Sequence, residues 1–421
     1  MKKLNKYYML IASLAVCFST FTSCHDDIYH LINEEVRLEE KGIFGDITTG
    51  TRFSKDGKTQ LLIANGKVFA KDITKDSTED FNSTGLYNEH WKKVINPEDQ
   101  NSPFYSKEVN FLAADAKYIY ALATSWKENL NGNNVIVKRE IFYSENGTEW
   151  TLIPSTVFGY DESDFFNCVL IFSNEALNPA DLNDGSNRNA YIKLIGSKLA
   201  SDYAPENKSA SIFKLKGADA PEEIQLEEIP KDTNNCSSST CKAVYFNGQD
   251  YFFNYTSAAA GPDYIYFNSK NETVVHYANA WTKEKGYYIS GSDKDGEAAQ
   301  DKGAILTLAV TKDYLLMGTT SGIQHTVLSA DGQPNAGTAK FSTNASTSLS
   351  ASYYVFNIFV RDPSMEEEKT DLYGTTTIHG SLSSTSISGL FKECGLWAYY
   401  PSRGTWNKDG TADTKTFPAG N

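Results

Sequence analysis

The chain has 421 residues, with 39 Lys and Arg against 53 Asp and Glu, so its formal net charge is −14 at pH 7. This charge argues against nucleic acid as a partner, because phosphates are bound by releasing counterions to basic side chains. With 40% hydrophobic and 13% aromatic residues, the chain can build a folded core, so wholesale disorder is excluded.

The N-terminus reads as a targeting segment. Three lysines at positions 2, 3 and 6 precede an apolar stretch over residues 7–21, which is shorter than the roughly 20 residues of a transmembrane helix. The stretch ends in Phe21, Thr22, Ser23 and Cys24, which resembles a bacterial lipobox. We therefore expect a lipoprotein signal peptide over 1–23 and acylation of Cys24, with an ordinary secretory signal or an uncleaved anchor as the alternative.

The residues after Cys24 suggest a destination. Asp26 and Asp27 follow it closely, and an acidic pair here resembles the signal that sends lipoproteins of gut-type Bacteroidetes to the outer face of the outer membrane. Residues 24–42 read as the lipidated N-terminus and an acidic tether. We expect a surface-exposed outer-membrane lipoprotein whose acyl chains hold it on the membrane; a periplasm-facing lipoprotein is the alternative.

The remaining cysteines fit an oxidising compartment. Cys236 and Cys241 flank a polar loop sequence and could form a disulfide, whereas Cys168 and Cys394 lie in strand-like runs and read as buried thiols. The sequence contains no CxxC motif and no Cys/His group with zinc spacing.

A strand repeat runs through the rest of the chain. Short apolar or aromatic runs bounded by Gly, Asn, Asp and Ser recur, without long helical periodicity after residue 42. One strand type begins at residues 61, 118, 191, 251, 314 and 372, at intervals of 57, 73, 60, 63 and 58. Each copy is followed by a second strand, and in five units an apolar strand precedes it, at 109–112, 166–172, 243–246, 305–308 and 354–359.

In the clearest copies a tight turn leads into a fourth strand that carries tryptophan. Four strands per unit and six units predict an all-β, six-bladed β-propeller of four-stranded antiparallel blades over residues 43–410, with a C-terminal tail at 411–421. Aromatic side chains would fill the spaces between blades. The alternatives are seven blades or a pair of β-sandwich domains.

The turn at residues 144–150 (SENGTEW) resembles the Asp-box of sialidase-type propellers, in which a turn is clasped by its own Ser and Asp. Residues 54–60 and 329–332 are poorer copies. Asn146 stands where Asp is usual, and in that family the box is a structural fastener away from the active site. The resemblance implies a fold and transfers no activity.

No contiguous motif identifies a reaction. A glycoside hydrolase needs two facing carboxylates, and the sequence does not show which of its acids converge. There is no Gly-x-Ser-x-Gly elbow. Asp293, Asp295 and Asp301 form a weak candidate for Ca²⁺, with a solvated acidic loop as the main interpretation, so no cofactor is predicted.

The loops of one propeller face are the expected ligand site. We expect Trp126 in a loop between the second and third strands of its blade, Tyr203 and His379 in similar loops, and Tyr160 and Asp161 in a connection between blades. An exposed tryptophan in a polar loop can stack on a sugar or anchor a protein; the alternative is that Trp126 folds back onto its own blade.

These observations favour a non-catalytic binding or scaffold lipoprotein that is monomeric and presents its loop face to a glycan or a surface protein. The alternative is an extracellular propeller-fold carbohydrate-active enzyme, either a glycoside hydrolase or a lyase. A converging group of ionisable side chains at the channel would favour the enzyme.

Overall fold

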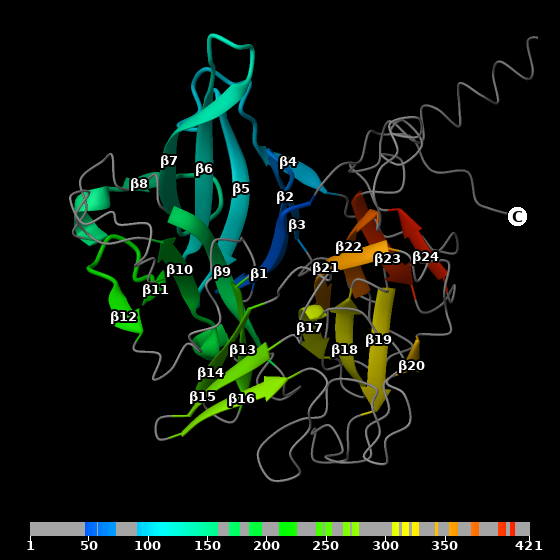
Figure 1. The fold of residues 1–421 in the computed structure, drawn as a ribbon. Helices are drawn as coiled ribbons and strands as arrows, with labels where there is room; N and C mark the ends of the chain where they lie inside the picture. Colours follow the sequence, from blue (N-terminus) through cyan, green and yellow to red (C-terminus); the bar gives the residue numbers. More distant parts are fainter. Residues whose placement is uncertain are drawn as a thin grey trace, which may run out of the picture. The chain divides into compact units, whose positions relative to one another are not determined.

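The computed structural model divides the chain into Met1–Gly42 and Ile43–Asn421. The residues it describes all belong to the second unit (Figure 1). They are 47–56, 58–72, 91–158, 168–176, 185–195, 210–224, 241–246, 249–254, 264–269, 272–277, 305–310, 314–319, 322–327, 342–343, 353–360, 372–378, 395–400 and 405–408.

The first two groups of four strands each form a separate antiparallel sheet. The first sheet consists of β1 (Thr49–Lys55), β2 (Lys58–Ala64), β3 (Val68–Asp72) and β4 (Lys92–Ile95). The second consists of β5 (Lys107–Ala114), β6 (Ile119–Glu128), β7 (Asn134–Ser144) and β8 (Thr151–Ile153). A short 3-10 helix, η2 (Ser155–Phe158), follows β8.

The third and fourth groups are joined into one sheet. The third is β9 (Cys168–Ala176), β10 (Ala190–Ile195), β11 (Ala210–Lys214) and β12 (Glu222–Ile224), with the 3-10 helix η4 (Gly185–Asn187) before β10. The fourth is β13 (Cys241–Phe246), β14 (Gln249–Asn254), β15 (Tyr264–Ser269) and β16 (Glu272–Tyr277). Their first strands, β9 and β13, pair in parallel, which gives eight strands in the order β12-β11-β10-β9-β13-β14-β15-β16.

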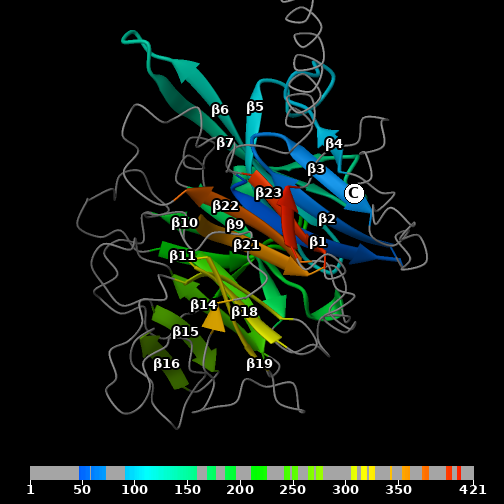
Figure 2. The ribbon, with the colours of Figure 1, turned by 90° about the vertical axis from the view of Figure 1, so that its right-hand side faces the viewer.

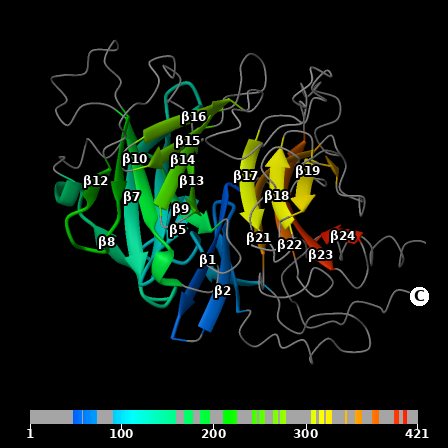
Figure 3. The same cartoon turned by 90° about the horizontal axis from the view of Figure 1, so that it is seen from below.

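The last two groups are again separate sheets. The fifth consists of β17 (Ile305–Val310), β18 (Tyr314–Thr319), β19 (Gly322–Val327) and β20 (Ser342–Thr343). The sixth consists of β21 (Tyr353–Val360), β22 (Leu372–Ile378), β23 (Gly395–Tyr400) and β24 (Thr405–Lys408). Figure 3 shows the fifth sheet beside the sixth, where β17 packs on β21.

Neighbouring sheets share buried clusters. One buried cluster joins the first and second sheets through residues such as Leu62 and Leu112, and another joins the second and third through Leu122 and Ile192. The fifth and sixth sheets share a cluster that contains Leu316. Stacked sheets of this kind bury both faces of their inner strands.

The last sheet also packs on the first. Leu61 and Trp91 of the first sheet's region share a buried cluster with Leu396 of β23. Arg52 of β1 donates from Nη1 to the carbonyl of Val360 in β21, at 3.4 Å, and Figure 2 shows β1 and β21 side by side. Packing between neighbouring sheets, combined with contact between the first and last sheets, is the arrangement of a β-propeller, so the predicted fold class is confirmed. The count of six blades stays a prediction.

Candidate functional site

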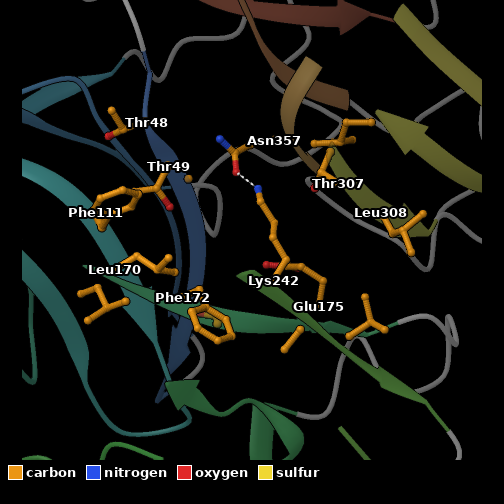
Figure 4. Close-up of a pocket in the computed structure, with 16 residues that line it drawn as sticks. Thr48, Thr49, Phe111, Leu170, Phe172, Glu175, Lys242, Thr307, Leu308 and Asn357 are labelled. Carbon is orange, nitrogen blue, oxygen red and sulfur yellow. Dashed lines mark hydrogen bonds between the residues drawn. The ribbon is translucent and has the colours of Figure 1, made fainter. Parts of the chain in front are cut away.

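One pocket is lined by the first strand of every group. Its walls are formed by residues of β1, β5, β9, β13, β17 and β21, together with Thr48, which precedes β1. The pocket therefore lies where the six groups converge (Figure 4). We call it the axial pocket. Its cavity measures about 50 Å³. The lining residues are Thr48, Thr49, Gly50, Phe111, Leu170, Ile171, Phe172, Ser173, Glu175, Lys242, Ala243, Val244, Thr307, Leu308, Asn357 and Ile358.

The register of β9 and β13 brings two charged side chains together. Val244 lies opposite Glu175 in this parallel pair. Side chains alternate between the two faces of a strand, so Lys242, two residues before Val244, is on the same face as Glu175. A lysine and a glutamate from different repeats therefore face the same pocket.

Lys242 reaches across the pocket to β21. Its Nζ donates to the backbone carbonyl of Phe356 at 2.6 Å and to Oδ1 of Asn357 at 2.5 Å. Figure 4 shows the side chain extended toward Asn357, between the walls that carry Thr49 and Thr307. Both acceptors are neutral, so they satisfy the geometry of the ammonium group without neutralising its charge.

Burial lowers the pKa of Lys242 to about 8, and the negative charge of Glu175 opposes this shift. A buried amine loses the hydration that stabilises its charged form, which is why its pKa falls. A group perturbed in this way inside a cavity is a recognised mark of a functional site.

Glu175 is held by an arginine. Nη2 of Arg188, just after η4, lies 2.8 Å from Oε1 of Glu175 and 3.2 Å from Oγ1 of Thr51 in β1. The hydroxyl groups of Thr51 and Ser173 are 3.1 Å apart, and Ser173 also accepts from the backbone N–H of Ala114 at 2.6 Å. These contacts tie β1, β5 and β9 together and fix the Glu175 carboxylate.

A second polar cluster, centred on Asp250, fastens the third group to the fourth. Asp250 of β14 accepts from Nδ2 of Asn174 at 2.6 Å, from Nδ2 of Asn189 at 2.7 Å, and from the Tyr191 hydroxyl. Burial raises the pKa of Tyr191, and the nearby Asp250 charge raises it further. The phenol therefore stays a protonated donor, and the cluster has a structural role.

The turn between β7 and β8 is closed by its own side chains. Ser144 Oγ accepts from the backbone N–H of Gly147 at 2.9 Å, and Asn146 Oδ1 accepts from the N–H groups of Thr148 and Glu149 at 2.9 and 3.0 Å. Gly147 has a φ of 78°, a conformation that favours glycine. Asn146 thus acts as the fastener of this turn in place of aspartate. The family resemblance drawn from the turn stays a prediction.

Of the ligand-face candidates, the structure describes Trp126. It lies in β6 rather than in a loop, because β6 and β7 continue as a paired ribbon in which Trp126 is opposite Ile136; our loop assignment for this residue is wrong. Its side chain is 41% exposed. Tyr160, Asp161, Tyr203 and His379 lie outside the described residues.

The other predicted sites fall largely outside the described ranges. These include the lipidation site Cys24, the weak calcium candidates Asp293, Asp295 and Asp301, and Cys236. Cys241 begins β13, directly before Lys242. In the described part of the chain, no three His, Cys, Asp or Glu side chains are grouped to hold a metal ion, and no helix there is long and apolar enough to cross a membrane.

Sequence reasoning missed the residues of the axial pocket. Glu175, Lys242 and Asn357 belong to three different repeats, and no contiguous motif contains them. The available signal was a polar side chain inside the apolar first strand of a repeat, as in residues 241–246 (CKAVYF). We looked for ligand residues in the loops instead.

No family model matches the chain, and no curated protein matches it. Among solved structures, one from the GH130 family of mannoside phosphorylases is 10% identical to this chain. That family is described as containing glycoside hydrolases that target β-1,2-mannosidic linkages in Candida mannan. The alignment covers 89% of this chain and 87% of that one, with a TM-score of 0.33.

Two further solved structures are similar in the same degree. The GH32 β-fructofuranosidase BmSUC1 of Bombyx mori is 7% identical over 86% of this chain and 62% of its own, with a TM-score of 0.32. A protein of Bacteroides thetaiotaomicron described as a glycosidase is 10% identical over 85% and 86%, also with a TM-score of 0.32. The fold assignment itself rests on the strand order and sheet packing above.

These comparisons correct our functional expectation. We expected a non-catalytic binding or scaffold propeller, and this is wrong, since the similar solved structures are glycoside-active enzymes. The physical reason for the error is that a sequence does not show which ionisable groups converge in the fold. In the fold, the ionisable pair of the axial pocket is assembled by the pairing of β9 with β13.

Proposed function

We propose that the chain is an extracellular carbohydrate-active enzyme whose reacting groups gather in the axial pocket. The observation that carries the proposal is the pair formed by Glu175 and Lys242, a carboxylate and a buried amine of lowered pKa on the same cavity wall. The desolvation of this amine destabilises the folded protein, and active sites are where proteins retain destabilising groups of this kind.

Glu175 is the proton acceptor of the proposed site. Arg188 holds one carboxylate oxygen at 2.8 Å and fixes its orientation. A general base has to be positioned before it can act efficiently. Lys242 supplies a positive charge in a cavity lined partly by apolar side chains, where charge developing on a substrate is stabilised more strongly than in water.

The residue set favours a lyase over a hydrolase. Glycoside hydrolysis uses two carboxylates across the scissile bond, and among the described lining residues Glu175 is the only carboxylate. Elimination requires a base that removes a proton next to a carbonyl-type group and a cation that stabilises the resulting charge. Glu175 and Lys242 match these two roles.

The remaining sequence inferences belong to the same proposal. The enzyme is attached through acylated Cys24 to the outer membrane and exposed at the cell surface, and its propeller has six blades with Asp-box-like turns. Trp126, Tyr160, Asp161, Tyr203 and His379 are proposed to contact the glycan beyond the axial pocket. A bound polysaccharide would extend from the axial pocket across these residues.

The test is a turnover screen of the full chain against neutral and acidic polysaccharides, with products identified by mass spectrometry. Hydrolysis adds water to the products, whereas elimination leaves an unsaturated sugar. Glu175→Gln and Lys242→Met should each lower turnover by about a hundredfold or more.

Glu145→Gln is the matched control. Glu145 is an exposed carboxylate that forms a 2.8 Å ion pair with Lys55, away from the axial pocket lining. It should leave turnover unchanged. Full activity in both Glu175→Gln and Lys242→Met would contradict the proposed site, and unchanged polymers throughout the screen would contradict the proposed activity.

A further inference from the structure

The axial pocket carries an unbalanced positive charge. Two cations, Lys242 and Arg188, lie around one carboxylate, Glu175, and the 2.8 Å ion pair of Glu175 is with Arg188. Within the described ranges, no carboxylate lies within ion-pair distance of the Lys242 amine, whose hydrogen bonds go to the neutral oxygens of Phe356 and Asn357. The ammonium charge is therefore available to a ligand.

The donor count of Lys242 points the same way. A protonated lysine carries three N–H donors. Two of them are used by Phe356 and Asn357. The third has no acceptor in the part of the chain that the structure describes, although the amine lies against the cavity. A buried donor without a partner favours an acceptor supplied from outside the chain.

The size of the cavity limits that acceptor. In the same measure, one water molecule needs roughly 10–15 Å³, so about 50 Å³ admits one small chemical group and excludes a whole sugar ring. A substituent of a larger ligand fits, with the remainder of the ligand outside.

The walls select the charge and shape of the group. Phe111, Leu170, Phe172 and Leu308 present apolar surface, while Thr49 and Thr307 bring hydroxyl groups. A low-dielectric wall strengthens the attraction between one cation and one anion. It also penalises any charge that remains uncompensated. One ammonium group therefore matches a monovalent, compact anion better than a multivalent phosphate.

We propose that the axial pocket binds the carboxylate of an acidic saccharide, a uronate residue within a glycan, with Lys242 as its ion-pair partner. This inference rests on the proposed function for the saccharide part of the ligand. The carboxylate itself follows from the charge, volume and donors of the pocket.

The experiment is calorimetric titration of the full chain at neutral pH. The probes are trigalacturonate, a neutral galactose trisaccharide, acetate and sulfate. Trigalacturonate should bind, and acetate, sulfate and the neutral trisaccharide should bind much more weakly. Lys242→Met should weaken trigalacturonate binding at least about tenfold, since one partner of a buried charge pair is removed.

Two further variants keep the test interpretable. Lys242→Arg retains the positive charge and should retain part of the binding even if Lys242→Met folds poorly. Lys67→Met removes a surface lysine that pairs with Glu98 at 3.0 Å, and should leave binding unchanged.

Each outcome decides a separate point. Equal binding of trigalacturonate by the wild type and Lys242→Met overturns the inference, as does absence of trigalacturonate binding. Acetate or sulfate binding as tightly as trigalacturonate overturns the saccharide assignment. Turnover of neutral glycans without binding of acidic ones overturns this inference and leaves the proposed function standing. Binding of trigalacturonate without turnover of any acidic polymer overturns the proposed function and leaves this inference standing.

Discussion

Because the amine of Lys242 is buried, the free energy of unfolding of the protein should change with pH in the alkaline range. In the folded chain its pKa is about 8, against a usual value of 10.5. Between these two values the unfolded chain binds more protons than the folded chain, so the free energy of unfolding rises with pH in this window. Below about pH 8 both states are protonated, and the full penalty of burying the charge is present.

The magnitude follows from the shift. One pKa unit corresponds to about 1.36 kcal/mol, so lowering the pKa from 10.5 to about 8 corresponds to about 3 kcal/mol. In Lys242→Met this contribution is absent. The difference in unfolding free energy between Lys242→Met and the wild type should therefore decrease by about 3 kcal/mol from pH 7 to pH 10.5. Loss of the bonds to Phe356 and Asn357 shifts the whole curve but not its slope.

The assay is urea denaturation of the full chain at a series of pH values, compared with the same series for Lys242→Met. Lys67→Met serves as the control, because it removes one exposed lysine without changing the axial pocket. A pH dependence shared by the wild type and Lys242→Met would refute the argument that the amine is buried with its charge uncompensated.

Three other predictions concern the lipidation site, the Asp250 cluster and Gly318. Cys24→Ser should abolish labelling of the chain by radioactive fatty acid, and labelling that survives would refute acylation at this position. Asp250→Ala should lower the free energy of unfolding by about 3 kcal/mol, measured by urea denaturation, because buried donors of Asn174, Asn189 and Tyr191 lose their acceptor; a loss no larger than that of the exposed Asp99→Ala would contradict this. Gly318→Ala should cost about 1–3 kcal/mol, because its Cβ would lie 2.6 Å from the Val355 carbonyl oxygen, whereas Gly185→Ala, with its nearest atom at 3.7 Å, should cost less.

Strand positions could be predicted from the sequence because they depend on local pattern. Residues 314–319 (YLLMGT) are an apolar run ended by small residues, and β18 occupies this range. The very short strands β12 and β20 escaped prediction, because Glu222–Ile224 and Ser342–Thr343 have no apolar run. Trp126 was misplaced since a polar, Asn- and Gly-rich sequence reads as a loop, although the strand pairing of β6 with β7 extends through it.

The site could not be predicted for a different reason. Glu175 faces Lys242 because of the parallel register between β9 and β13, in which Val244 is opposite Glu175. A shift of one residue would turn Lys242 to the other face. Such a register between two repeats depends on packing of the whole ring, and no local feature of either segment specifies it.

The structure also indicates why the axis can carry a lysine that destabilises the fold. Stability comes from the buried clusters between sheets, such as the one that joins Leu62 to Leu112, and Lys242 is not a member of that cluster. If Lys242 served packing alone, a methionine would fill the space beside Leu170 and Phe172 without the cost of desolvating an amine. Glu175 is already neutralised by Arg188, so Lys242 is not needed as its ion-pair partner. The charge of Lys242 is then explained by what enters the pocket, which is the reason to test binding before turnover.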